Sequence, residues 1–98
     1  MGVYLENVVY NELLVRGYDV SVGNIQNGEI DFIATKDHKI EYYQVTYMLS
    51  TDDVIERKFG AYKNIDDNYP KYVISTDTFD MSQNGIIHKN IIDWLLDR

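Results

Sequence analysis

Polar side chains recur at alternating positions of two neighbouring apolar segments. The segments are residues 28–35 (GEIDFIAT) and residues 40–48 (IEYYQVTYM), both rich in β-branched and aromatic residues, and the polar stretch between them predicts a hairpin turn. Because side chains alternate along a strand, one face of this hairpin receives Glu29, Asp31, Gln44 and Thr46. A polar cluster inside an otherwise apolar hairpin is costly to bury without partners, so it predicts a functional site or the remains of one.

The register of the hairpin decides which of these side chains meet. We assume that Thr35 and Ile40 close the antiparallel pair, which places Asp31 opposite Gln44 and the other two polar residues opposite each other. The opposite face of the hairpin is then expected to be core. That face carries Ile30, Phe32, Ala34, Tyr43, Val45 and Tyr47.

An acidic residue also lies within the apolar stripe of the first predicted helix, residues 2–16. On a helical wheel the stripe consists of Val9, Leu13, Glu6, Tyr10, Val3 and Leu14. Glu12 lies outside it. An acid in such a stripe requires a partner within the fold, so Glu6 is expected to approach Asp31. The alternative is a boundary glutamate that reaches water.

The remaining elements complete an order of αβββαβ(β)α. A strand is expected at residues 18–22, a helix from about residue 51 to residue 65, a strand at 71–75, a short fifth strand from residue 86, and a closing helix at 90–96. This order predicts an α+β fold with a mixed central sheet of four to five strands flanked by helices. Trp94 is expected in the core, and His88 at the surface or a sheet edge.

The composition indicates one domain spanning residues 1–98. Hydrophobic residues make up 45% of the chain, and the absence of cysteine excludes thiolate metal sites and cysteine nucleophiles. No apolar run reaches the length of a membrane span and no leader is visible, so we expect a cytoplasmic protein without a membrane partner. The net charge of −7 works against unaided nucleic-acid binding, although a local basic patch is compatible with it.

The pattern of polar residues resembles that of the restriction-endonuclease-like nucleases. Their motif, PD-(D/E)-x-K, follows a helix that carries a glutamate, and the matching positions here are Glu6, Asp31, Gln44 and Thr46. Five segments look more closely like the C-terminal nuclease-like domain, of undefined function, of a prokaryotic family of AAA-type ATPases. They are LENVVYNELLVRGYDV, GEIDFIA, YYQVTY, DDNYPKYVIS and GIIHKNIIDWLL. The resemblance implies that the chain is the C-terminal part of a longer protein with an upstream ATPase part.

The resemblance also implies a chemistry. In active members Mg²⁺ is held by the strand acids and a backbone carbonyl, which correspond here to Asp31, Gln44 and the carbonyl of Val45, with Glu6 in support. The substrate would be DNA, and the lysine that orients or deprotonates the attacking water corresponds to Thr46.

Two departures from the motif set the functional expectation. Gln44 replaces an acid but keeps an oxygen ligand, whereas Thr46 supplies no positive charge. We therefore expect a catalytically degenerate module that serves as an interaction, regulatory or DNA-contacting domain. The alternative is a weak Mg²⁺-dependent DNA endonuclease with a displaced lysine. The candidates for that cation are Lys58, Arg57 and Lys39.

Overall fold

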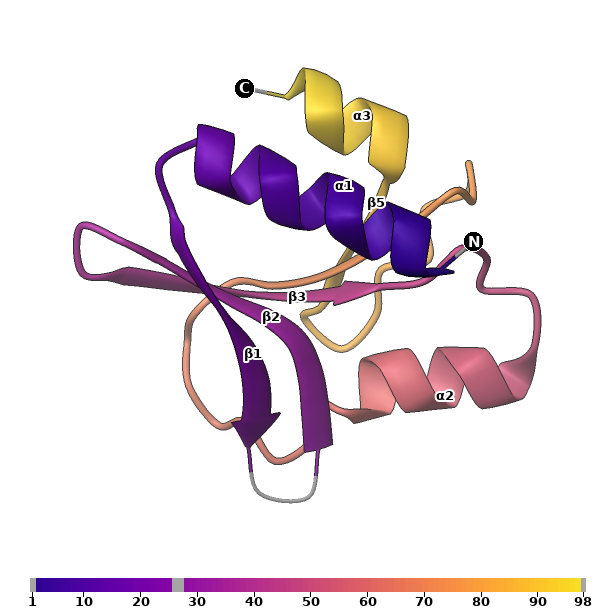
Figure 1. Ribbon diagram of the computed structural model, residues 1–98. Helices are drawn as coiled ribbons and strands as arrows, with labels where there is room; N and C mark the ends of the chain where they lie inside the picture. Colours follow the sequence, from indigo (N-terminus) through magenta and orange to yellow (C-terminus); the bar gives the residue numbers. More distant parts are fainter. Residues whose placement is uncertain (1, 26–27, 98) are drawn as a thin grey trace.

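The computed structural model describes residues 2–25 and 28–97. In chain order the elements are α1 (Gly2–Val15), β1 (Asp19–Ile25), β2 (Gly28–Lys36), β3 (Lys39–Val45), α2 (Asp52–Gly60), β4 (Lys71–Ser75), β5 (Ile87–Asn90) and α3 (Ile91–Leu96). This order confirms the predicted α+β fold with a mixed, five-stranded sheet flanked by helices (Figure 1).

The strands are arranged in the order in which they occur in the chain. β1, β2 and β3 are antiparallel neighbours, whereas β3, β4 and β5 run parallel, with α2 in the connection between β3 and β4. The assumed hairpin register is confirmed, because Thr35 pairs with Ile40. The backbone pairing of β2 with β3 ends at Phe32 and Tyr43, one step before Asp31 and Gln44.

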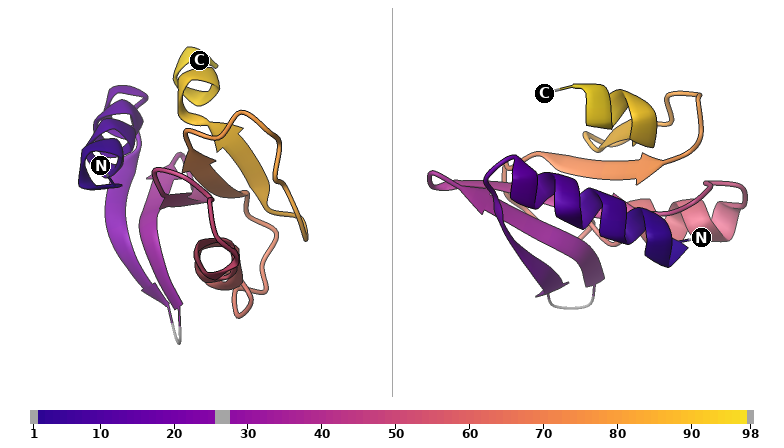
Figure 2. Two further views of the ribbon diagram at one scale, coloured as in Figure 1. Left: turned by 90° about the vertical axis from the view of Figure 1, so that its right-hand side faces the viewer. Right: turned by 45° about the horizontal axis from the view of Figure 1, so that its top comes forward.

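The sheet separates two hydrophobic cores (Figure 2). α1 and α3 cover one face, where Val9, Leu13 and Trp94 pack on the sheet, so the prediction that Trp94 is a core residue is confirmed. α2 covers the other face, where Phe59 packs with Tyr62. β3 and β4 contribute to both cores, since their side chains alternate between the faces.

The helical wheel placed the inward face of α1 correctly only in part. Leu5, Val9 and Leu13 are buried, but the other apolar members of the expected stripe are exposed: Val3, Tyr10 and Leu14. α1 is apolar on nearly all sides, so its sequence does not distinguish the inward face. Glu12, expected outside, is buried and forms an ion pair with Arg16 at 2.8 Å.

A β-bulge changes the direction of side chains in β2. Ser21 pairs with Ile33 and Gly23 with Ile30, so two residues of β2 lie opposite one residue of β1. Ile30 therefore packs on the α2 side of the sheet, which corrects its expected place beside Phe32.

Three further expectations are corrected by the structure. α2 ends at Gly60 and turns follow it, whereas the sequence predicted a helix to residue 65. Tyr47 lies past the end of β3 and is exposed. His88 lies on the edge strand β5, one of its two expected places, but its side chain is buried rather than at the surface. Among the described residues no helix has the length and apolar character needed to cross a bilayer.

Candidate active site

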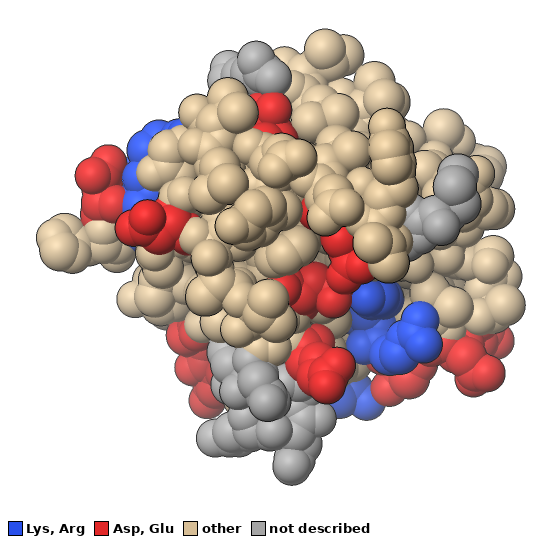
Figure 3. Space-filling model, in the orientation of Figure 1, with Lys and Arg blue, Asp and Glu red and all other residues tan. Residues whose placement is uncertain are grey.

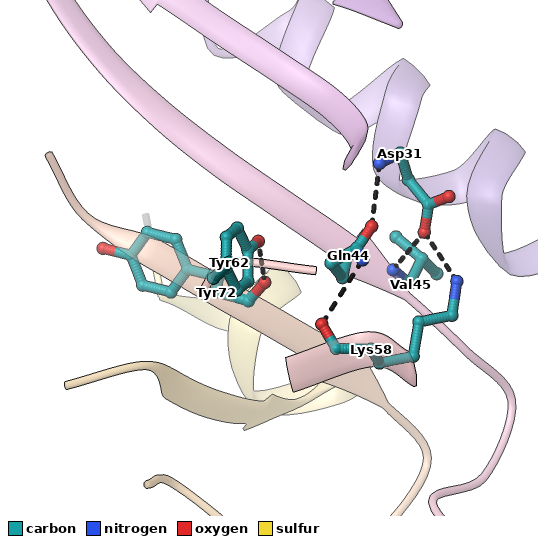
Figure 4. A network of polar contacts seen from close by, with 6 residues as sticks. All are labelled: Asp31, Gln44, Val45, Lys58, Tyr62 and Tyr72. Atoms are coloured by element: carbon teal, nitrogen blue, oxygen red, sulfur yellow. Dashed lines mark hydrogen bonds and ion pairs between the residues drawn. The ribbon is translucent and has the colours of Figure 1, made fainter. Parts of the chain in front are cut away.

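Asp31 lies where the backbones of β2 and β3 separate (Figure 4). Its backbone N–H donates to Gln44 Oε1 at 2.8 Å, and the N–H of Val45 donates to Asp31 Oδ2 at 2.8 Å. Side-chain oxygens thus take the place of the backbone acceptors that a regular ladder would supply. The predicted meeting of Asp31 and Gln44 is confirmed.

Lys58 reaches the same carboxylate from α2. Its Nζ lies 2.9 Å from Asp31 Oδ2, and the two side chains are only 15% and 19% exposed. The other carboxylate oxygen of Asp31 points away from these partners (Figure 4). A cation therefore contacts the central acid of the cluster, although the strand itself carries none at position 46.

Gln44 holds the strand and the helix together. Its side chain is buried beneath α2, with Oε1 accepting from Asp31 and Nε2 donating to the backbone carbonyl of Lys58 at 3.3 Å. An amide in this arrangement presents the aspartate and the lysine to each other. Its oxygen is already engaged by an N–H group, so the geometry favours a positioning role for Gln44 over the metal ligation that the resemblance implies.

Glu6 is half-buried on α1 and lies beside Asp31. The two side chains line one cavity of about 260 Å³, together with Glu29 and the bulged region of β1 and β2. Glu6 and Asp31 thus share a cavity, and a direct approach of the two side chains stays a prediction. The bulge lies at this part of β2, and residues of β1, β2 and α1 line the cavity together.

A second cavity of about 570 Å³ joins the site to α2. Asp31 and Glu29 line both cavities, and the α2 side of the larger one carries Arg57 and Lys58. Acidic and basic side chains meet on this part of the surface, below the middle of the face in Figure 3. We call the two cavities together the Asp31 groove.

The remaining predicted residues lie close to the groove or outside it. Thr46 follows β3, is half-buried, and its N–H donates to the carbonyl of Ile74 at 3.0 Å, which continues the pairing with β4. The ladder ends before Thr46 and Glu29, so the structure does not pair them. Val45 meets Asp31 through its N–H. Lys39 pairs with Lys36 at the far end of the hairpin and is not brought to Asp31.

The sequence carries a signal for Lys58 that spacing alone reveals. Lys58 lies three residues after Ile55 on α2, and Ile55 packs against the core under this helix. Residues at this spacing share one side of a helix, so Lys58 belongs to the edge of the inward stripe rather than to the solvent face. A lysine there reaches the sheet with its ammonium group and requires an acid.

Tyr62 is buried in the core under α2, where it feels the charge of Asp31. Burial is the main cause that raises its pKa well above the ordinary value, and the negative charge of Asp31 adds to the effect. The phenol therefore stays protonated and donates to the backbone carbonyl of Tyr72 at 2.7 Å (Figure 4). It fixes the turn after α2, and hence Lys58, against β4.

A serine, a histidine and an aspartate also meet at the carboxyl end of β4. His88 Nδ1 accepts from the N–H of Met81, so Nε2 carries the proton and donates to Ser75 Oγ at 2.7 Å. Ser75 Oγ in turn donates to Asp77 Oδ2. The imidazole cannot accept the serine proton in this order, and Ser75 is fully buried, so the arrangement stabilises the loop and is not a hydrolytic triad.

Comparison with known proteins gives one relative of undefined activity. An uncharacterized protein of Haemophilus influenzae is 39% identical over 98 residues, which cover 94% of this chain and 22% of that protein. The chain thus spans less than a quarter of the length of the curated relative that it matches. No family model matches the chain, and no solved structure does.

Proposed function

We propose that this chain is a nuclease module of the restriction-endonuclease-like fold that hydrolyses DNA phosphodiester bonds with a divalent metal ion, with Lys58 as the displaced lysine. The observation that carries the proposal is the contact of 2.9 Å between Lys58 Nζ and Asp31 Oδ2. It restores the acid–lysine pair that the strand lacks because of Thr46. The helix that bears Glu6 and the αβββαβ order support the same assignment.

The groove offers the donors that a hard cation prefers, although not as a preformed cage. Glu6, Glu29 and Asp31 line one cavity, and Asp31 has an oxygen turned away from Lys58. Among the described residues no group of three or more acidic or histidine side chains is already arranged around a metal position. The metal would therefore be held by Asp31 and Glu6 with several waters. When bound, it stabilises negative charge on the phosphoryl oxygens.

The protein residues contribute orientation and charge. Lys58 holds a positive charge next to the position of the reacting phosphate and can orient the attacking water through its ammonium protons. Gln44 fixes the backbones of Asp31 and Lys58 relative to each other, which positions both groups before substrate binds.

A second candidate function is a catalytically silent module that acts in interaction, regulation or DNA contact. It is favoured by the engagement of Gln44 Oε1 with a backbone N–H and by the threonine at position 46. In either case we propose that the module works within a longer cytoplasmic polypeptide, with the upstream ATPase part that the resemblance implies. The greater length of the Haemophilus influenzae relative supports the part of this proposal that places the module in a longer polypeptide.

Plasmid cleavage tests the proposal. The chain is incubated with supercoiled DNA in Mg²⁺ or Mn²⁺, beside Asp31→Asn, Lys58→Met and the control Lys39→Met. Lys39 is exposed at the far end of the hairpin and does not line the groove. We expect cleavage by the unmodified chain, a loss of about 100-fold or more in the two groove variants, and unchanged cleavage by the control.

A lysine swap separates a catalytic from a structural role of Lys58. If Lys58 supplies only a positive charge, Thr46→Lys in the Lys58→Met background should restore part of the cleavage. Residue 46 lies two positions after Gln44, so a side chain there is expected on the same side of the sheet. Absence of cleavage by the unmodified chain would overturn the nuclease proposal in favour of the silent module. Cleavage that survives in Asp31→Asn would place the activity elsewhere.

A further inference from the structure

The cations of the described residues are almost all engaged by protein groups. Five form ion pairs with carboxylates: Arg16, Lys58, Lys63, Lys71 and Lys89. Lys36 donates to the backbone carbonyl of Arg16 at 2.7 Å. Within the described ranges, the side chains of Arg57 and Lys39 form no hydrogen bond or ion pair with a protein group, and Lys39 lies at the hairpin turn.

Arg57 therefore stands out by its place. It is exposed on α2, next to Lys58 in the chain, and it lines the same groove as Asp31 and Gln44. The protein supplies it with no carboxylate partner, although Glu29 and Glu56 line the same cavity. An unpaired guanidinium at the rim of a groove that ends in an acid–lysine pair is available to an anionic ligand.

We propose that Arg57 binds a phosphate of the DNA backbone adjacent to the one placed at Lys58 and Asp31, so that the groove takes a strand of at least two consecutive phosphates. This inference rests on the proposed function. A guanidinium forms paired hydrogen bonds with phosphate oxygens, which fixes the direction of the bound backbone as well as its position. Glu6 lines only the α1 side of the groove and repels phosphates there, so we place the strand on the α2 side, along Lys58 and Arg57.

The local charge explains how a domain of net charge −7 can contact DNA at all. Two neighbouring cations, Lys58 and Arg57, lie on α2, and the charge of Glu56 beside them is balanced by Lys63, whereas Glu6 lines only the α1 side of the groove. Binding is therefore expected to be weak, confined to this edge and strongly dependent on Arg57.

Binding without cleavage provides the first test. The affinity of the chain for a short single- or double-stranded DNA is measured in EDTA over a series of salt concentrations, for the unmodified chain, Arg57→Gln and the control Lys39→Gln. The two variants change the charge equally. We expect Arg57→Gln to weaken binding about tenfold at low salt and to lower the salt slope by about one, as loss of one phosphate contact does. The control should follow the unmodified chain.

Cleavage provides the second test. Arg57→Gln should lower kcat/KM for DNA about tenfold more than it lowers kcat/KM for bis(p-nitrophenyl) phosphate, because this small diester has no neighbouring phosphate for Arg57 to bind. Equal losses on both substrates, or an unchanged salt slope, would overturn the role of Arg57. Failure of the nuclease proposal is recognised separately, because it would abolish cleavage of both substrates by the unmodified chain while leaving the binding comparison intact.

Discussion

A single oxygen of Asp31 accepts hydrogen bonds from a backbone amide and from an ammonium group. This sharing joins β3 and α2 through one carboxylate. Gln44 makes the complementary connection, since its oxygen serves β2 and its nitrogen serves α2. The four polar contacts depend on one another, so the site is built from groups that would otherwise be unpaired in a half-buried position.

The bulge that turns Asp31 toward these partners depends on a glycine. Gly23 lies in β1 opposite Ile30, and an added Cβ would lie 2.9 Å from Ile30 Cβ and 3.0 Å from the side chain of Ile33. Neither neighbour can yield easily, because Ile30 is buried and its Cβ is attached to the paired backbone of β2.

Gly23→Ala is therefore expected to destabilise the chain by about 1–3 kcal/mol through overpacking. Urea unfolding measures the change. Gly60→Ala is the matched control, since its Cβ would meet only the flexible end of Glu56 and alanine favours the helix, so stability should be equal or slightly higher. Equal stability of Gly23→Ala and the unmodified chain would mean that the bulge is not held by this close contact.

At the scale of elements, the hairpin was predictable and the bulge was not. The polar turn and the alternation along residues 28–48 determine the register, because a shift by one residue would bury polar side chains. The bulge arises in the pairing of β2 with β1, and the alternation of residues within the hairpin carries no information on that pairing. Ile30 was assigned to the wrong core for this reason, although Phe32 and Ala34 were assigned correctly.

The ends of helices and the buried polar residues show a similar limit. α1 and the stripe around Glu6 gave an ambiguous wheel because apolar residues surround the helix, and the burial of Glu12 depends on an ion pair with Arg16. His88 lies on an edge strand, as one of its two expected places requires, yet its ring is buried, because Ser75 and the N–H of Met81 satisfy both ring nitrogens. Such tertiary partners are not visible in local sequence.

The loop between β4 and β5 gives a prediction on pH. Burial lowers the pKa of His88 below its ordinary value of 6.5, with the charges of Asp77 and Asp80 opposing the shift in part. The unfolded chain therefore takes up a proton first as the pH falls. Stability from the neutral imidazole is present above the ordinary value and decreases below it, by at most about 1.4 kcal/mol for each pH unit.

Urea unfolding between about pH 7.5 and about pH 5.5 measures this decrease, since the carboxyl group of Asp67, whose pKa is lowered from 3.8, titrates below that range. His88→Gln should be less stable at the upper pH and should show a flatter pH dependence. His38→Gln, at an exposed position of the hairpin turn, is the control and should keep the slope of the unmodified chain. An equally steep slope in His88→Gln would show that another group is responsible.

At the scale of the whole molecule, one sheet connects two cores that share no helix. The core under α2 contains Phe59, and the core under α1 and α3 contains Trp94, the single tryptophan of the chain. β3 and β4 place alternate residues in both, for example Val73 and Ile74. Loss of packing on one face should therefore loosen the strands on which the other face depends, and the domain should unfold as one unit.

Phe59→Leu tests this coupling by disturbing one core and observing the other. The substitution removes part of a buried ring and should destabilise the chain by about 1 kcal/mol or more, which lowers Tm by about 4–8 °C for each kcal/mol in a domain of this size. Thermal unfolding is followed by Trp94 fluorescence and by far-UV circular dichroism, and both midpoints should decrease equally. Phe79→Leu, at a side chain that is 82% exposed, is the matched control and should leave both midpoints in place. If only the circular dichroism midpoint changed, the α1–α3 side would unfold separately. The Asp31 groove, which is lined by residues of both α1 and α2, would then lack a common rigid support.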